Sequence, residues 1–272
     1  MNIVNFIGNT PLLEAERGLF LKLEYLNPSG SVKDRAAKYI LSAAALSRGD
    51  ALVEATSGNF GISLAMLSAA FGYKFTAVMP RSVSSERERI IRAYGAEVIF
   101  ASNMAEAVAV SRDVNGFKPR QFENPLNPLA HYETTGPEIW RDTKGNVDIL
   151  LAGVGSGGTI MGVGRYLKEQ NPAIRIISLL PRERKHKIEG IGPGFASPLY
   201  DETLVNETVF VTDAEAALGS RQLIRMGIFA GVSSGAAYFA AKELIGREEN
   251  MGKSIALILP DSADRYFSCG LL

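Results

Sequence analysis

The feature that most constrains the fold is a regular alternation of short apolar runs with longer runs of helical period. Apolar runs of strand length lie at 19–26, 52–55, 74–79, 97–101, 148–152, 175–180, 208–211 and 254–259. Runs of helical period lie at 36–46, 60–71, 84–94, 104–113, from the glycine-rich stretch 153–159 to about residue 170, and from 213 onward. This alternation predicts an α/β fold of mostly parallel sheets with helices on both faces. In the 84–94 segment we expect Arg87, Glu88 and Arg89 to point outward.

Charge and composition exclude several classes of protein. Basic and acidic residues number 29 each, so the formal net charge is zero and nucleic acid is not expected as a partner. The one cysteine, Cys269, excludes an internal disulfide, and with two histidines it makes a metal site improbable. No apolar stretch reaches the length of a membrane span, so we expect a cytoplasmic protein without a membrane partner.

Lys33 occupies an unusual position for a lysine. It lies in 27–35 (NPSGSVKDR), between an apolar run and a helical run, and Ser31 is a good N-cap. The positive end of the helix dipole, the neighbouring Arg35 and burial would all disfavour an ammonium group there. Such a lysine can lose its proton and attack a carbonyl to form a Schiff base. The alternative is a solvated lysine at a helix start, paired with Asp34.

The glycine-rich stretch 153–159 (GVGSGGT) predicts a phosphate site. It lies between a predicted strand and a predicted helix, where backbone N–H groups and the positive helix end attract anions. Its G-x-G-x-x-G spacing also fits a dinucleotide site, but the next strand ends in 179–182 (LLPR) without the acidic residue that such a site needs. A P-loop would need Gly-Lys-Ser/Thr, and a plain tight turn would need fewer glycines.

Two further polar stretches precede predicted helices, and the first of them follows the strand predicted at 52–55. Thr56, Ser57, Gly58 and Asn59 offer hydroxyls, an amide and helix-start N–H groups that would suit a carboxylate. The stretch 233–235 (SSG) precedes a helix of small residues. Without further context both stretches are equally consistent with simple helix caps.

Read together, four motifs resemble the cysteine synthase and cystathionine β-synthase family. The motifs are 28–35 (PSGSVKDR), 56–59 (TSGN), 155–159 (GSGGT) and 231–235 (GVSSG). The resemblance runs from 7–11 (IGNTP) to 260–262 (PDS), nearly the whole chain. It implies pyridoxal 5'-phosphate (PLP) as the cofactor and the two-lobed tryptophan synthase β-like fold (fold type II).

The resemblance also implies residue roles. Lys33 would carry PLP and act as the catalytic base, and the PLP phosphate would lie on Gly155, Ser156, Gly157, Gly158 and Thr159. Asn59 would bond the ring hydroxyl and Ser233 the pyridine nitrogen. The substrate would be bound by Thr56, Ser57, Gly58, Asn59, Gln121, Gly190 and Ile191. His131 is expected to be structural.

A larger, PLP-anchoring lobe is expected at 1–36 plus 136–272, with a smaller, mobile substrate-binding lobe at 37–135. A homodimer is expected by resemblance, and docking of a serine acetyltransferase tail is a possible further interaction.

The activity implied is PLP-dependent β-replacement, which makes L-cysteine from O-acetylserine or O-phosphoserine and sulfide. Alternatives are another nucleophile such as homocysteine, deamination of serine or threonine, and a PLP-fold protein that only binds or regulates. Two departures concern the substrate pocket: Phe60 replaces the usual threonine and Glu189 the common glutamine. The basic segment 182–187 is either a solvated loop or a site where Arg182, Arg184 or Lys185 binds a substrate phosphate.

Overall fold

The large sheet forms the centre of the molecule. The structure is a computed structural model and describes residues 2–192 and 197–271. The strands of the large sheet, in spatial order, are β1 (Leu12–Glu16), β2 (Leu19–Leu23), β9 (Ile255–Leu259), β6 (Ile149–Gly153), β7 (Arg175–Pro181) and β8 (Glu207–Val211). Only the β1–β2 pair is antiparallel, so the predicted, mostly parallel α/β fold is confirmed.

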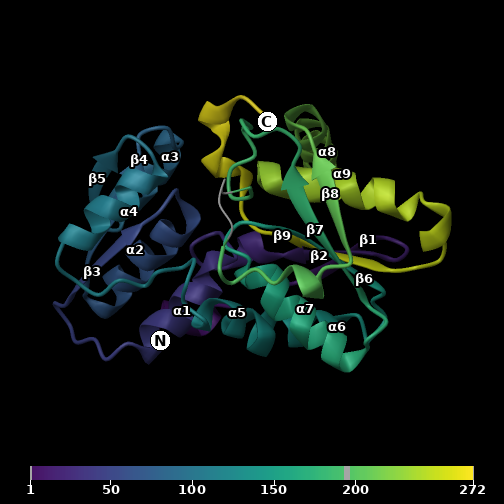
Figure 1. Cartoon of the computed structure of the whole chain (residues 1–272), viewed down its shortest axis with the longest axis horizontal. Coiled ribbons are helices and arrows are strands. Elements are labelled where there is room, and N and C mark those ends of the chain that lie inside the picture. The colour runs from purple at the N-terminus through teal and green to yellow at the C-terminus, as the bar shows by residue number, and fades with distance from the viewer. Residues whose placement is uncertain (1, 193–196, 272) are drawn as a thin grey trace.

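A second, small sheet lies beside it (Figure 1). Its three strands, β3 (Ala51–Ala55), β4 (Lys74–Pro80) and β5 (Glu97–Ala101), are all parallel. Its helices are α2 (Asn59–Phe71), α3 (Ser85–Ala93) and α4 (Met104–Asp113). The chain leaves the large sheet through α1 (Lys33–Ala43) and returns through α5 (Leu126–Ala130), a π-helical turn (His131–Thr135) and α6 (Gly136–Asp142).

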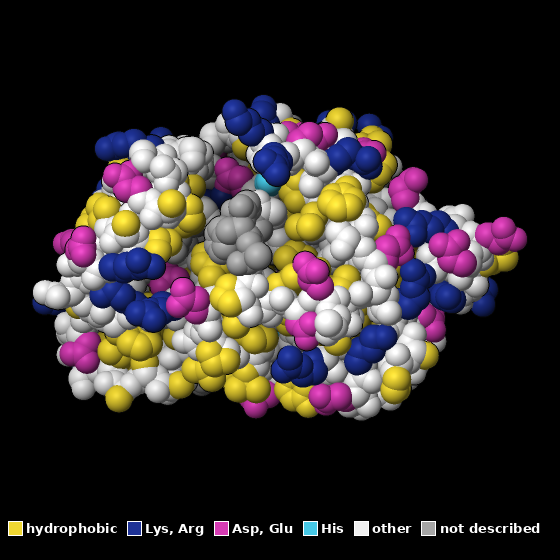
Figure 2. Space-filling view, viewed as in Figure 1, with side chains coloured by type: hydrophobic (Ala, Val, Ile, Leu, Met, Phe, Trp, Pro, Cys, Tyr) yellow, Lys and Arg dark blue, Asp and Glu magenta, His cyan; other side chains and the backbone are white. Residues whose placement is uncertain are grey.

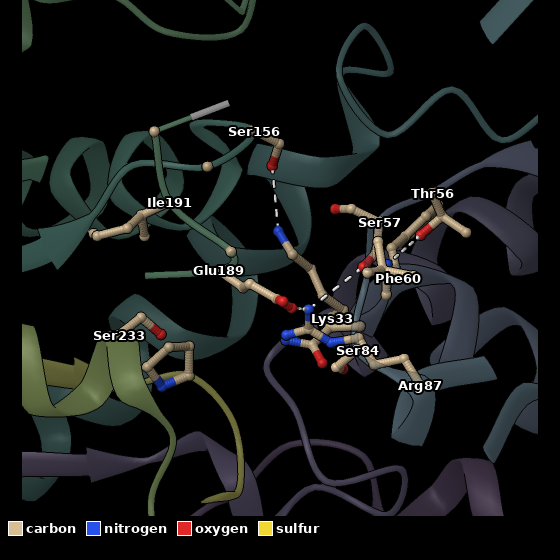
Figure 3. A pocket seen from close by; sticks show the side chains of 18 of the residues that line it. Lys33, Thr56, Ser57, Phe60, Ser84, Arg87, Ser156, Glu189, Ile191 and Ser233 are labelled. Atoms are coloured by element: carbon tan, nitrogen blue, oxygen red, sulfur yellow. Dashed lines mark hydrogen bonds and ion pairs between the residues drawn. The ribbon is translucent and has the colours of Figure 1, made fainter. Parts of the chain in front are cut away.

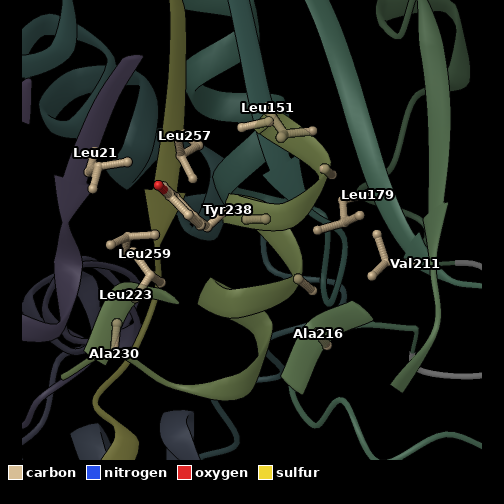
Figure 4. Close-up of a cluster of buried hydrophobic side chains, with 14 of the residues drawn as sticks. Leu21, Leu151, Leu179, Val211, Ala216, Leu223, Ala230, Tyr238, Leu257 and Leu259 are labelled. Carbon is tan, nitrogen blue, oxygen red and sulfur yellow. The ribbon is translucent and has the colours of Figure 1, made fainter. Parts of the chain in front are cut away.

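Helices cover both faces of the large sheet because its strands alternate their side chains between two cores. Leu151 and Leu257 pack with α8 (Asp213–Arg225) and α9 (Val232–Ile245) on one face (Figure 4). Leu150 and Ala256, one residue away along the same strands, pack with α6 and α7 (Gly158–Gln170) on the other. A strand buried on both faces reads as a continuous apolar run, as the sequence predicts.

A buried cluster of charges fixes the start of α1. The Arg35 guanidinium pairs with Glu24 and Glu138 at 2.7 Å each, and Lys22 pairs with Glu138 at 2.6 Å. All four side chains are almost completely buried. The cluster therefore ties α1 to the strand before it and to α6, which holds Lys33 in a defined place.

Several local expectations need correction. The strand expected at 19–26 ends at Leu23, and a 3-10 turn follows (Glu24–Leu26). Helix α1 begins at Lys33 with Val32 in the N-cap position, while the hydroxyl of Ser31 accepts a hydrogen bond from the Lys33 amide at 3.3 Å. Strand β1 and the helices of 126–142 are additions that the apolar pattern did not predict.

The surface is mixed in charge. Basic and acidic side chains are interspersed over the face seen in Figure 2. No helix within the described ranges is long and apolar enough to cross a membrane.

Candidate active site

One cavity lies where the loops at the carboxyl ends of strands from both sheets meet. Its volume is about 740 Å³. Such loop clusters are the usual ligand sites of open α/β sheets. Among the residues predicted for the site, those that line it are Lys33, Thr56, Ser57, Gly58, Asn59, Gln121, Gly155, Ser156, Gly157, Thr159, Gly190, Ile191 and Ser233 (Figure 3). Gly158 is not part of the lining.

Lys33 projects from the first turn of α1 toward the glycine loop. Its Nζ donates to the Ser156 hydroxyl over 3.4 Å. Burial lowers the pKa of the Lys33 amine to about 8, although the nearby Asp261 carboxylate opposes the shift. Arg35, expected to contribute, is instead paired with carboxylates. The alternative of a Lys33–Asp34 pair is also wrong, because Asp34 is fully buried and accepts hydrogen bonds from Ser29.

Two glycines of the glycine loop, Gly155 and Gly158, pack so closely that a Cβ would not fit there. A Cβ on Gly155 would overlap the carbonyl oxygen of Gly190, and one on Gly158 would overlap the Asn127 side chain. Gly157 adopts a left-handed backbone with φ of 84° just before α7 begins. The loop therefore brings backbone N–H groups and the positive end of a 13-residue helix to the cavity, which is the geometry of a phosphate site.

His131 contacts the glycine loop through Thr159. Its Nδ1 is 2.9 Å from the Thr135 hydroxyl and its Nε2 is 3.3 Å from that of Thr159. Burial, together with the positive charge of Arg35, lowers the pKa of the imidazole to about 3, so the ring is neutral. These contacts fit a structural role.

The loop after β3 forms the opposite wall. The Thr56 hydroxyl accepts hydrogen bonds from the amides of Gly58 and Gly61, both at 3.1 Å, so this side chain fixes the loop backbone. Ser57 is exposed and lines the cavity. The Asn59 amide donates to Asp261 at 2.6 Å and accepts from Arg265 at 2.6 Å.

Both backbone groups of Gln121, the N–H and the carbonyl, form hydrogen bonds with buried side chains. Its amide N–H donates to the buried Glu54 carboxylate at 3.0 Å, and its carbonyl accepts from Asn127 Nδ2 at 2.8 Å. The same Asn127 nitrogen donates to Ser156 at 2.9 Å, so it joins the Gln121 loop to the glycine loop. Sequence reasoning missed Glu54 and Asn127, because both act on segments that are distant along the chain.

Ser233 lies in the first turn of α9 and lines the cavity on the side of the large sheet (Figure 3). It is nearly buried. The neighbouring Ser234 is completely buried and does not line the cavity. The structure therefore separates the two serines: Ser233 lines the cavity and Ser234 does not.

Arg87 was expected to point outward, and this prediction is wrong. Its side chain is only 2% exposed and lines the cavity, whereas Arg89 on the same helix is exposed. Arg87 lies four residues before the buried Ile91 and therefore shares its face of α3. It forms an ion pair with Glu189 across the cavity mouth and donates to the Tyr266 hydroxyl at 2.9 Å.

The basic segment 182–187 only partly reaches the site. Arg182, Arg184 and Lys185 are exposed and lie outside the cavity lining, whereas His186 and Lys187 are part of it. The Arg182 guanidinium donates to the Phe210 carbonyl at 3.2 Å. The geometry therefore does not favour these three residues as the phosphate site.

Comparison with known proteins gives consistent similarities. A family model described as pyridoxal-phosphate dependent enzyme matches residues 3–261. Cysteine synthase 3 of Caenorhabditis elegans is 45% identical over 97% of this chain and 88% of its own length. The crystal structure of cysteine synthase from Entamoeba histolytica has a TM-score of 0.93 at 37% identity, covering 99% of this chain and 90% of that one. O-ureido-L-serine synthase gives 0.93 at 36% identity, covering 99% and 94%.

Proposed function

The chain belongs to the family of pyridoxal-phosphate dependent enzymes, and we propose that it makes L-cysteine from an activated serine and sulfide by β-replacement. It is a PLP-dependent enzyme with the α/β fold of that family. The activated serine is O-acetylserine or O-phosphoserine. The names of similar proteins, Cysteine synthase 3 and cysteine synthase, support the reaction.

The residues of the cavity fit PLP. Lys33 supplies an amine whose lowered pKa leaves part of it neutral near physiological pH, as attack on an aldehyde requires. Gly155 to Thr159 and the start of α7 form an anion cradle in which Gly155 and Gly158 have no room for a Cβ. Ser233 would bond the pyridine nitrogen and Asn59 the ring hydroxyl. When bound, PLP supplies an electron sink for charge that develops on the substrate.

Lys33 is the proposed catalytic base. With the substrate bound, the free Lys33 amine would take the proton from Cα. The bond from Cβ to acetate or phosphate then breaks, and the electron pair leaves with that group. Sulfide adds at Cβ, and Lys33 returns the proton to Cα. A neutral Ser233 hydroxyl, instead of a carboxylate, as the partner of the ring nitrogen would favour brief charge storage and rapid loss of the leaving group.

The loop from Thr56 to Asn59 and the Gln121 side chain are proposed to orient the substrate carboxylate. Ser57 is open to the cavity, Thr56 holds the loop amides in place, and Gly190 and Ile191 close the other side. A fixed carboxylate sets the direction of the Cα–H bond relative to the Lys33 amine. We further propose that the segment 37–135 moves as the smaller lobe against 1–36 plus 136–272 and excludes water when it closes.

The observation that carries this proposal is the convergence of three groups on one cavity: the Lys33 amine, the phosphate-type loop 3.4 Å away and the carboxylate-type loop after β3. The test is the visible spectrum of the purified protein during titration with O-acetylserine and then O-phosphoserine. One ester should change the cofactor absorbance, and sulfide should restore it with release of cysteine. Unchanged spectra with both esters would reject the cysteine synthase function.

A different nucleophile is the second candidate. It is favoured by Glu189 and Phe60, both of which line the cavity where the family pattern has other residues. A similar protein is named as a synthase of O-ureido-L-serine. Parallel reactions with sulfide, homocysteine and no nucleophile distinguish β-replacement with sulfide, β-replacement with a thiol and deamination.

Assembly and location are part of the proposal as well. A homodimer is supported by exposed apolar side chains around a shallow depression near the N-terminus, formed by Ile3, Phe6 and Leu26. Sedimentation of wild type and Phe6→Ser tests it, because the variant should dissociate. A cytoplasmic location is supported by the single cysteine. Binding of a serine acetyltransferase tail is testable by adding its C-terminal peptide.

A further inference from the structure

Arg87 is a buried guanidinium in the cavity wall. It comes from α3 of the small sheet, its side chain is 2% exposed, and it covers Gly58, where a Cβ would overlap the Arg87 side chain. A buried arginine must be paired, because an uncompensated charge in the protein interior is costly. The question is which of its partners are permanent.

Two partners are permanent. Tyr266 accepts from Arg87 at 2.9 Å, its ring lies 4.9 Å from the guanidinium carbon, and Asp261 lies 3.9 Å from the same guanidinium. Both residues are fully buried, and Tyr266 also donates to Asp261. These contacts fix one edge of the guanidinium but do not satisfy all of its N–H donors. Within the described part of the chain, the buried Nε has no hydrogen-bond partner.

Arg87 Nη1 also donates to the Ser57 carbonyl, over a long 3.5 Å. The remaining partner, Glu189, is exchangeable. Glu189 lies on the segment after β7, its side chain is 25% exposed, and its carboxylate pairs with Arg87 from the other side of the cavity (Figure 3). A carboxylate at this exposure can turn into water at little cost in hydration, whereas Asp261 cannot. If Glu189 leaves, Nη1 keeps only the long contact to the Ser57 carbonyl and Nε has no partner among the described residues, while the side chain lines a ligand cavity.

We propose that Arg87 is a specificity-determining subsite for a second anionic group on a reacting molecule, and that Glu189 occupies it until that group arrives. The group is a phosphate or carboxylate, since these match the guanidinium in charge and geometry. Its source is either the leaving group of the activated serine or the thiol nucleophile. The inference rests on the proposed β-replacement for its substrates, but not for the anion site itself.

The competition with Glu189 makes the subsite selective. A neutral acetyl group gains nothing by displacing Glu189, so O-acetylserine leaves the ion pair intact. A phosphate ester that displaces Glu189 forms its own charge-assisted hydrogen bonds with the Arg87 guanidinium, and these replace the ones that Glu189 made. Removing Glu189 should therefore favour the anionic reactant over the neutral one, and removing Arg87 should do the opposite.

The test compares Glu189→Gln and Arg87→Gln in the holoenzyme. Glu88→Gln and Arg89→Gln, on the solvent side of the same helix, are matched controls for the change in charge. One arm measures the ratio of kcat/KM for O-phosphoserine to that for O-acetylserine with sulfide. The other measures the ratio for homocysteine to that for sulfide with O-acetylserine. Calorimetry with inorganic phosphate measures anion binding without turnover.

In the arm that matches the true source, Glu189→Gln should raise the ratio by about tenfold and Arg87→Gln should lower it by about tenfold, as expected for one charge-assisted contact. Glu189→Gln should also tighten phosphate binding, and Arg87→Gln should weaken it. Ratios and phosphate affinities that match those of the controls in both arms would overturn the subsite.

Two failures remain distinguishable. If no activated serine reacts in wild type, the proposed function fails, and the phosphate titration still decides the anion site. If Arg87→Gln does not fold, Glu189→Gln decides alone, since its partly exposed side chain can be replaced without leaving a cavity: an unchanged phosphate affinity then rejects the proposal.

Discussion

Glu54 provides the sharpest test of the electrostatics around the site. It lies on β3, is 5% exposed, and accepts hydrogen bonds from the amides of Arg120 at 2.9 Å and Gln121 at 3.0 Å. Burial raises the pKa of its carboxyl from 4.5 to about 7, against the lowering effect of the two amides; Glu123 adds to the rise and Arg120 opposes it. The perturbation is Glu54→Gln, which has the same shape and no titration.

The sign and size follow from linkage. Because the pKa is higher in the folded than in the unfolded chain, the folded state binds the extra proton between pH 4.5 and 7, and the free energy of unfolding falls as pH rises through that window. The shift from 4.5 to about 7 corresponds to about 3 kcal/mol. The Glu54→Gln variant does not titrate, so its stability does not fall over this pH range. Its NH₂ group, however, is a donor that faces one of the two amide donors, and the lost hydrogen bond lowers its free energy of unfolding by about 1 kcal/mol.

The two stability profiles should therefore cross. Below pH 5 the wild type should be more stable than Glu54→Gln by about 1 kcal/mol, and at pH 8 less stable by about 2 kcal/mol. Urea unfolding at four pH values measures both profiles. His131, whose lowered pKa gives the opposite slope, is present in both proteins and cancels in the difference. Parallel profiles for wild type and Glu54→Gln would refute the reasoning. Glu97→Gln, exposed at the start of β5, is the control and should give a profile parallel to that of the wild type.

Three further predictions concern the cofactor and the fold. Lys33→Ala should abolish turnover and the absorbance of the lysine-linked cofactor, whereas Lys38→Ala should keep both; turnover in Lys33→Ala would exclude it as the base. Gly155→Ala should weaken PLP binding in equilibrium dialysis by more than about tenfold through overlap with Gly190, and equal affinity with Gly246→Ala would contradict the cradle. Arg35→Met should lower the free energy of unfolding by about 3–5 kcal/mol because buried Glu24 loses its ion-pair partner and buried Glu138 keeps only Lys22. The exposed pair Arg92–Glu88 gives the comparison: Arg92→Met should cost below about 1 kcal/mol, and similar losses for both would reject the cluster.

The sequence predicted the parts of the fold that are local. Strands such as β6 and β9 are buried on both faces, and their unbroken apolar runs follow directly from that burial. The glycine loop was predictable because close backbone approach leaves no room for side chains. Strand β1 was not predictable, since it is an edge strand with mostly exposed residues and no core to impose alternation.

The site was predictable where one segment supplies both the group and its setting. Lys33 carries its own signal, because the helix start and the loop before it are contiguous in sequence. Asn127 carries none: its significance comes from bonding Gln121 and Ser156 at once, and only the fold brings those two segments together. Sequence spacing cannot reveal such a bridge, because its two ends have no fixed separation along the chain.

Arg35 and Arg87 show what burial alone leaves undecided. Both are arginines within the first few residues of a helix, and both are almost fully buried. The difference lies in their partners: Glu24 and Glu138 are almost completely buried around Arg35, while Arg87 has one carboxylate that is a quarter exposed. A closed set of partners stabilises the fold and has nothing to exchange. A buried charge with one partner open to solvent can exchange that partner for a ligand, and this difference in exposure makes Arg87 the candidate for substrate selection and Arg35 the anchor of α1.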